Sequence, residues 1–189
     1  MLLLQNKAGI VTGAGQGIGR AIAQRFAAEG AAVVVADFNR EAGEETVQLI
    51  KDQGGQASFA YGDVSDEASV KAMVDNAVNS FGKLDIACNS AALSRGAGPI
   101  HEYTREVFDQ TLEMCLTNTW LCMKYEIPAM LAQGGGAIVN ISSNASLRGQ
   151  AFNTAYAAAK SGVNVLTQSS AAEYGAQGIR INAVSPGVI

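Results

Sequence analysis

The feature that most constrains the fold is a repeated alternation of short apolar runs with longer segments of helical periodicity. Runs at 8–12 and 31–36 are rich in Val and Ile, and apolar residues recur at helical spacing over 18–28 between them. This pattern predicts a strand, a helix and a strand. Further strands are expected at 57–61, 84–88, 137–142 and 179–185, and further helices at 40–53, 66–81, 104–132 and 153–174.

Strands that alternate with helices are joined by right-handed crossovers into a parallel sheet that helices cover on both faces. We therefore expect an α/β fold with about six strands in a doubly wound, mostly parallel sheet. The length of 189 residues, of which 48% are hydrophobic, falls within the usual size of one domain. Since there is no repeat, low-complexity tract or linker, residues 1–189 are predicted to form a single domain.

A glycine-rich run lies between the first strand and the first helix. It reads Thr-Gly-Ala-Gly-Gln-Gly-Ile-Gly over 12–19. The start of a helix offers free N–H groups and the positive end of its dipole, which favour a pyrophosphate. Gly13 would make the tight turn, Gly17 would let the phosphates approach, and Gly19 would let the helix pack on the strand. An ordinary strand-to-helix turn is the alternative interpretation.

An acidic residue at the end of the second strand favours the nucleotide interpretation. Asp37 follows Gly19 by eighteen residues, where a carboxylate can accept both hydroxyls of an adenosine ribose. The same charge would repel a 2′-phosphate, so we expect NAD. Because Arg20 and Arg40 lie nearby, NADP stays possible. The sequence thus predicts an NAD-binding domain of the Rossmann type.

A tyrosine and a lysine four residues apart suggest catalysis. Tyr156 and Lys160 would lie on one face of the helix predicted at 153–174. A tyrosine, whose ordinary pKa is about 10, becomes an effective base when a cation lies close to it. A surface pair without function is the alternative. Ser143 follows the strand at 137–142, at the edge where open α/β sheets bind ligands. Ser142 offers the same hydroxyl, and a serine that only caps a helix or forms a turn is the alternative interpretation.

Together these residues resemble the short-chain dehydrogenase/reductase family. The resemblance is in Thr12 followed by Gly13-x-x-x-Gly17-x-Gly19, and in Ser143, Tyr156 and Lys160 at their spacing. Its alcohol dehydrogenase and 3-oxoacyl-reductase-like members are the most similar. This resemblance implies an NAD(P)-dependent oxidoreductase that moves a hydride between the cofactor and a small secondary alcohol or ketone. Tyr156 would be the general acid and base, with Ser143 and Lys160 as its catalytic partners.

The resemblance also implies a set of cofactor-binding residues. They are Thr12, Gly13, Gly15, Gln16, Gly17, Ile18, Gly19, Asp37, Asp63, Val64, Asn89, Ala91, Tyr156, Lys160, Pro186, Gly187 and Ile189. Ala92 stands where the family has a glycine. By the same comparison, the chain is expected to lack the substrate-covering loop and the last strand.

The main departure from the family pattern is Cys115, which aligns with the family's catalytic asparagine. A thiol is a weak donor and a weak acceptor, so it would support a proton-relaying water poorly. Asn118, one helical turn later, is a possible substitute. We expect turnover to be reduced but not abolished. The alternative function is a weak or silent dinucleotide-binding protein, and a sugar-nucleotide epimerase or dehydratase is a third and weaker one.

Composition excludes several other classes of protein. A net charge of −4 gives no basic surface for nucleic acid. No apolar run reaches the length of a membrane span, so we expect a cytoplasmic protein without a membrane partner. Three cysteines without ligand spacing and a single histidine, His101, predict neither a disulfide framework nor a metal site. The resemblance implies a homodimer or homotetramer paired through the helices at 104–132 and 153–174.

Overall fold

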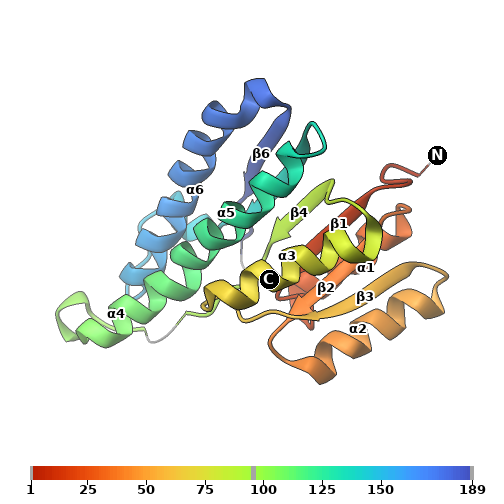
Figure 1. Cartoon of the computed structure of the whole chain (residues 1–189). Coiled ribbons are helices and arrows are strands. Elements are labelled where there is room, and N and C mark those ends of the chain that lie inside the picture. Colours follow the sequence, from red (N-terminus) through yellow and green to blue (C-terminus); the bar gives the residue numbers. More distant parts are fainter. Residues whose placement is uncertain (1, 95–96, 188–189) are drawn as a thin grey trace.

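The computed structural model describes residues 2–94 and 97–187 and contains one six-stranded sheet (Figure 1). All neighbouring strands pair in parallel, in the order β3-β2-β1-β4-β5-β6. The strands are β1 (Ala8–Thr12), β2 (Ala32–Asp37), β3 (Gln56–Tyr61), β4 (Ile86–Asn89), β5 (Gly136–Ile141) and β6 (Ile179–Val184). The order reverses between β1 and β4, and such a switch point leaves a crevice at the carboxyl ends of the strands.

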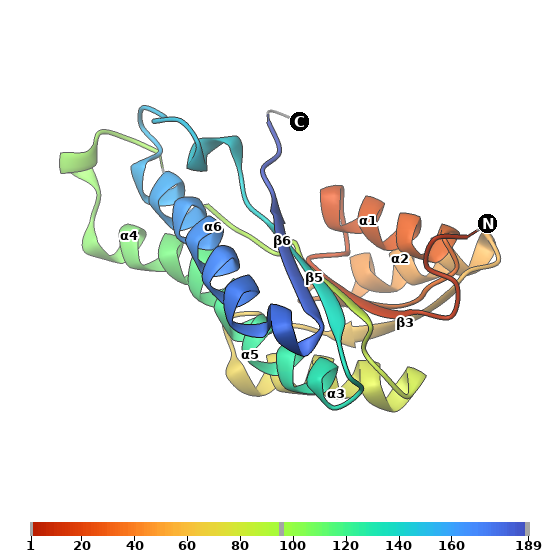
Figure 2. The same ribbon diagram turned by 90° about the horizontal axis from the view of Figure 1, so that it is seen from above.

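The described residues also form six α-helices. They are α1 (Gly17–Ala28), α2 (Arg40–Asp52), α3 (Glu67–Phe81), α4 (Arg105–Leu112), α5 (Asn118–Leu131) and α6 (Thr154–Tyr174). Helices α1 and α2 lie on one face, and α3 and α5 lie on the other (Figure 2). The predicted doubly wound sheet of six parallel strands is therefore confirmed.

Alternating residues of the central strands explain why both faces need a cover. Along β2, Val33 and Val35 belong to the apolar core that contains residues of α1 and α2. Val34 and Ala36 belong to the second core, with residues of α3, α5 and α6. All four side chains are buried. Continuous apolar runs of this kind are typical of parallel strands that are buried on both faces.

Two predicted elements differ from the sequence-based expectation. The strand expected at 84–88 is Ile86–Asn89, because the backbone N–H of Leu84 bonds to the side chain of Gln133 instead of to a strand. The single helix expected at 104–132 is interrupted between α4 and α5 by a π-helical turn, Glu113–Thr117. A π-turn adds a residue to the helical repeat and rotates the side chains that follow it. Hydrophobic spacing alone does not reveal such a turn.

No helix within 2–94 and 97–187 is both long and apolar enough to span a bilayer. The three cysteines are all buried free thiols. His101 lies in a short 3₁₀ segment before α4, with its side chain exposed.

Candidate active site and cofactor cleft

The glycine-rich loop joins β1 to α1 at the switch point of the sheet. Gly13 has a φ of +63° and would place a Cβ 2.9 Å from Cα of Ala91, while a Cβ on Gly19 would lie 2.1 Å from the carbonyl oxygen of Gly13. Both positions therefore require glycine for backbone packing. Gly17, with a φ of +55°, is different, because a Cβ there would meet nothing within 4 Å. Its surface is open to a ligand.

The start of α1 is suited to an anion. Gln16, its N-cap residue, makes no side-chain hydrogen bond to the helix, and the first turn carries no acidic residue. Helices α2, α3 and α4 begin instead with capping side chains, from Asn39, Asp66 and Thr104. Uncapped N–H groups beside the open surface of Gly17 provide the donors that a pyrophosphate needs. The loop thus fits a dinucleotide on its own geometry.

Asp37 ends β2 with its carboxylate held in place. One oxygen accepts the N–H of Gly15 at 2.7 Å, and the other accepts the N–H of Asn39 at 2.9 Å. Each carboxylate oxygen retains acceptor capacity beyond one such bond. The arrangement fixes a negative charge directly beside the glycine loop, where the sequence placed the ribose-binding acid.

Two residues expected to bind cofactor direct their side chains into the protein. The Thr12 hydroxyl accepts the N–H groups of Ser90 and Ala91, at 3.0 and 3.1 Å. The Asn89 amide donates to Glu126 and to Asn140, both at 3.0 Å. Both residues are buried. Thr12 holds the segment after β4 against the end of β1, and Asn89 ties β4 to α5 and β5.

Three more of the residues expected to bind cofactor, Asp63, Val64 and Pro186, follow strands at the same edge of the sheet. Asp63 follows β3 and accepts the N–H and hydroxyl of Ser65, and Val64 beside it is buried. Pro186 follows β6, and its carbonyl accepts the N–H of Asn144 at 2.8 Å. Ile189 lies outside the described residues.

The predicted catalytic residues gather where β5 ends and α6 begins. Lys160 is buried, its ammonium donates to the carbonyl of Ile141 at 2.7 Å, and it lies 5.9 Å from the ring centre of Tyr156. Burial lowers the pKa of Lys160, and the neighbouring Cys115 opposes this shift. The structure therefore brings the lysine and the tyrosine together on the inner face of α6.

The two candidate serines have different surroundings. The Ser142 hydroxyl is buried and donates to the Lys160 carbonyl at 3.0 Å, so it anchors α6 to the sheet. Ser143 is partly exposed, and its hydroxyl accepts the N–H of Ala145 at 3.1 Å. It keeps a hydroxyl hydrogen for another acceptor. Of the two serines, Ser143 has the hydroxyl that a substrate oxygen can reach.

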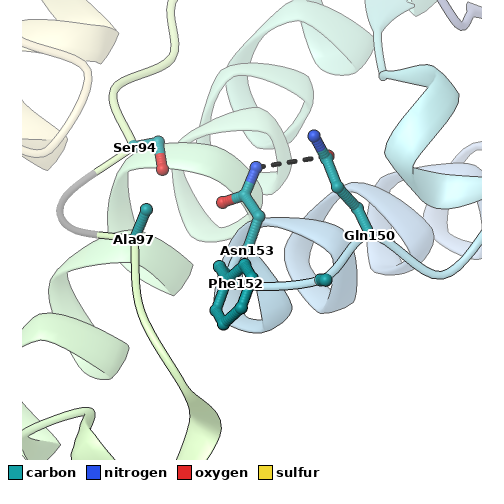
Figure 3. A pocket seen from close by; sticks show the side chains of 6 residues that line it. Ser94, Ala97, Gln150, Phe152 and Asn153 are labelled. Carbon is teal, nitrogen blue, oxygen red and sulfur yellow. Dashed lines mark hydrogen bonds between the residues drawn. The ribbon is translucent and has the colours of Figure 1, made fainter.

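A pocket of about 440 Å³ adjoins the first turn of α6. Ser94 and Ala97 face Phe152 and Asn153 across it, and Gln150 accepts a hydrogen bond from Asn153 (Figure 3). Phe152 is 61% exposed and has a left-handed backbone, with a φ of +63°. This conformation is costly for a bulky residue. Its carbonyl is held by the N–H of Gly98 at 2.9 Å and the hydroxyl of Tyr103 at 3.2 Å.

Sequence reasoning did not find the Phe152 pocket. A positive φ at a non-glycine residue has no reliable sequence signal, and the pocket joins segments separated by more than fifty residues.

Within the described residues, no group of His, Cys, Asp and Glu side chains is placed to hold a metal ion.

Comparison with known proteins decides the family. Residues 7–189 match the family model described as short chain dehydrogenase. The chain belongs to the short-chain dehydrogenases. A 2,5-dichloro-2,5-cyclohexadiene-1,4-diol dehydrogenase from Sphingobium indicum is 44% identical to it over 98% of this chain and 74% of that protein. A cyclohexanol dehydrogenase from an Acinetobacter strain is 41% identical, over 97% of this chain and 73% of that protein.

Solved structures agree with this assignment. Carveol dehydrogenase from Mycobacterium avium, crystallised in complex with NAD, has a TM-score of 0.95 and 32% identity, over 98% of this chain and 72% of that one. The resemblance inferred from the glycine spacing and from the serine, tyrosine and lysine is confirmed. As a short-chain dehydrogenase, the chain is an NAD(P)-dependent oxidoreductase that acts on CH–OH groups.

The departure from the family pattern lies in the π-helical turn. Cys115 is fully buried there, and its thiol donates to the carbonyl of Leu93 at 3.4 Å. Burial raises the pKa of this thiol, which Lys160 and the Leu93 bond oppose. Asn118 does not replace the family's asparagine, because its amide nitrogen donates to the carbonyls of Ala91, at 2.8 Å, and Met114, at 2.9 Å. Asn118 supports the segment after β4.

We expect Cys115→Asn to raise kcat at neutral pH by up to about tenfold, since the amide would restore a strong donor and acceptor near Lys160. Steady-state rates measure this effect. Cys115→Ser is the matched control, because it keeps a donor for Leu93 without the reach of an amide. Thermal unfolding would show whether the larger side chain disturbs packing. An unchanged rate in a stable Asn variant would mean that the relay does not limit turnover.

Proposed function

We propose that this short-chain dehydrogenase uses NAD to oxidise an alicyclic secondary alcohol to its ketone, or to catalyse the reverse reduction. The observation that carries the proposal is the approach of the Lys160 ammonium to the Tyr156 ring, about one helical turn after the pocket residues Phe152 and Asn153. The names of the relatives support the substrate class, because a cyclohexanol dehydrogenase and a cyclohexadiene-diol dehydrogenase both act on six-membered carbon rings.

NAD is favoured over NADP by charge. The carboxylate of Asp37 would accept the ribose hydroxyls and repel a 2′-phosphate. The two arginines nearby are both paired with glutamates, Arg20 with Glu45 at 2.5 Å and Arg40 with Glu44 at 3.0 Å. When bound, NAD supplies the position that accepts or returns the hydride. The open surface at Gly17 and the free N–H groups of α1 would hold its pyrophosphate.

Three side chains would position the substrate oxygen and transfer its proton. Ser143 donates a hydrogen bond to that oxygen and keeps it beside Tyr156. Tyr156 removes the hydroxyl proton during oxidation and returns it during reduction. Lys160 stabilises the negative charge that develops on the tyrosyl oxygen, and its burial strengthens this interaction because little water screens it.

Phe152 would recognise the carbon ring of the substrate. Its side chain is exposed at the pocket while its carbonyl is held by Gly98 and Tyr103, so the backbone that carries the phenyl group is fixed at the pocket. An exposed aromatic ring at a pocket provides apolar surface for a ligand to cover. The pocket volume lies within the usual range for small-molecule sites.

We expect Phe152→Ala to lower kcat/KM for cyclohexanol about fivefold to tenfold, through the loss of buried apolar contact. The same variant should change kcat/KM for propan-2-ol less than about twofold, because that alcohol lacks a ring. Ile100→Ala, which removes an exposed apolar side chain outside the pocket, is the control. Equal losses for both alcohols would contradict a role in ring recognition.

Two measurements test the proposed function. Calorimetric titration with NADH measures cofactor binding, and nicotinamide absorbance across a panel of cyclic and acyclic secondary alcohols measures turnover. We expect binding, with turnover of the cyclic alcohols. Cys115 favours one alternative, a dinucleotide-binding protein without turnover. NADH binding with no absorbance change across the panel would support that alternative and overturn the proposed activity.

We also propose that the chain assembles with its own copies through the outer faces of α5 and α6. Trp120 on α5 is 46% exposed and Val165 on α6 is 61% exposed, and apolar side chains of this kind favour burial in an interface. Sedimentation velocity would reveal a monomer if this proposal is wrong. The cytoplasm is our proposed location, and the three free thiols suit its reducing conditions.

A further inference from the structure

Arg20 is held beside the glycine loop by three partners, of which the carbonyl oxygen of Ala42 is the most distant, at 3.5 Å from Nη2. Its guanidinium donates from Nε and Nη2 to the carbonyl oxygen of Gly15, at 2.9 and 2.5 Å. Nη2 also contacts the carboxylate of Glu45, at 2.5 Å. Arg20 belongs to α1 and Glu45 to α2, so this contact joins the two helices across the loop. The Arg20 side chain is 24% exposed.

The Gly15 backbone places this guanidinium close to the ribose-binding acid. Its N–H donates to Asp37 at 2.7 Å, while its carbonyl accepts from Arg20. A carboxylate and a guanidinium therefore lie on either side of one residue. The charges run from Asp37, which is negative, through Arg20, which is positive, to Glu45, which is negative.

An arginine beside the ribose-binding acid could also favour NADP, by binding its 2′-phosphate. Guanidinium is the group that best recognises phosphate, because its planar donors match two phosphate oxygens at once. Here Nε and Nη2 are already bonded, to the backbone of Gly15 and Ala42 and to the carboxylate of Glu45. Arg40 is also paired, with Glu44, but both of those side chains are more than half exposed, and such pairs contribute little. In the Arg20–Glu45 pair, the glutamate is 59% exposed and the arginine only 24%.

We propose that Glu45 is a specificity-determining residue, which acts by holding Arg20 away from the 2′-position of the adenosine ribose. This inference rests on the proposed use of NAD. Asp37 excludes a 2′-phosphate directly, whereas Glu45 neutralises and positions the guanidinium that is bonded to the glycine loop. Glu45 does not touch the cofactor, so it is a positioning residue.

The test compares two small ligands that differ by one group. Adenosine 5′-monophosphate lacks the 2′-phosphate that adenosine 2′,5′-bisphosphate carries. Calorimetric titration of both ligands into the whole chain gives a ratio of affinities that does not depend on turnover. Glu41→Gln is the matched control for Glu45→Gln, because it removes the same charge from α2 at a residue with no ion pair among the described residues.

In an Asp37→Ser background, we expect Glu45→Gln to raise the affinity for the bisphosphate about fivefold relative to Glu41→Gln. The affinity for the monophosphate should change much less. Adding Arg20→Gln should remove the gain, since the released guanidinium is then absent. Equal gains from Glu45→Gln and Glu41→Gln, or a gain that survives Arg20→Gln, would overturn the proposal.

Two further observations keep the outcomes distinct. If circular dichroism shows that Asp37→Ser does not fold, the single variants Glu45→Gln and Glu41→Gln decide the question through the same ratio. A parent chain that binds neither adenosine monophosphate nor NADH would refute the proposed function. A parent chain that binds both, with no difference between the two glutamate variants, would refute this inference alone.

Discussion

Replacement of Tyr156 by phenylalanine is expected to lower kcat about 10²-fold to 10⁴-fold, the usual contribution of a group that transfers a proton in the transition state. Phenylalanine keeps the aromatic ring that lies 5.9 Å from the Lys160 ammonium and removes only the hydroxyl. The packing at the start of α6 should therefore persist. Steady-state rates with cyclohexanol and calorimetric titration with NADH measure the two effects separately.

NADH affinity in Tyr156→Phe should stay within about fivefold of the parent value, because one hydrogen bond contributes about 1 kcal/mol. Tyr125→Phe provides the control, since it removes a tyrosine hydroxyl that bonds to Glu67 on α3. That variant should turn over normally. If Tyr156→Phe retained most of its activity, another group would have to carry the proton, and the role given to Tyr156 would be wrong.

A second large effect is expected at Glu126, a carboxyl in the core between the sheet and α5. It is fully buried, and one of its oxygens accepts the amide of Asn89 at 3.0 Å. The other oxygen, Oε1, has no hydrogen-bond partner, and neither has Oδ1 of Asn89. Burial raises the pKa of Glu126 to about 7, which the Asn89 bond opposes. The neutral form of this group is therefore favoured in the folded protein.

The pH dependence of the free energy of unfolding follows from the raised pKa of Glu126. The folded pKa of about 7 lies above the ordinary value of 4.5, so the folded state binds a proton more tightly than the unfolded state does. The stabilisation is present at low pH and is lost as pH rises through the folded pKa. From about pH 5 to about pH 8 the free energy of unfolding should fall by roughly 2–3 kcal/mol on account of Glu126.

Glu126→Gln should abolish that loss, because glutamine resembles the neutral carboxyl and does not titrate. Urea unfolding at a series of pH values measures the difference. The two other titratable groups that face Glu126 are Cys88 on β4 and Cys122 on α5, and burial raises the pKa of both thiols. Both stay neutral over this range in parent and variant alike. Glu173→Gln, at an exposed carboxylate on α6, is the control, and parallel curves for parent and Glu126→Gln would disprove the assignment.

Much of the fold was predictable because its signals are local. Apolar runs such as that of β2 and helical spacing such as that of α1 are contained within single elements, and parallel α/β sheets follow from their alternation. The π-helical turn at Glu113–Thr117 was not predictable, since it depends on how α4 and α5 pack against the rest of the chain. It was therefore expected as part of one continuous helix.

The candidate site was predictable in its chemistry and less so in its orientations. Tyr156 and Lys160 share a helix, so their spacing was sufficient to place them together. Thr12 and Asn89 stand at the expected positions, but their side chains bond to partners 78 and 51 residues away, which no local pattern reveals. The pairing of Arg20 with Glu45, across 25 residues, belongs to the same class.

The pairing of β1 with β4 at the centre of the sheet has a consequence for how the site is completed during synthesis. Chains are made from the amino end, and their early segments fold first where they can. The half proposed to bind the nucleotide, which contains β1, β2, β3 and Asp37, leaves the ribosome before β4 does, so one edge of β1 is unpaired during that interval. Tyr156 and Lys160 arrive later still. Only the pairing of β4 with β1 brings the two halves, and with them the proposed nucleotide-binding and catalytic residues, into one site.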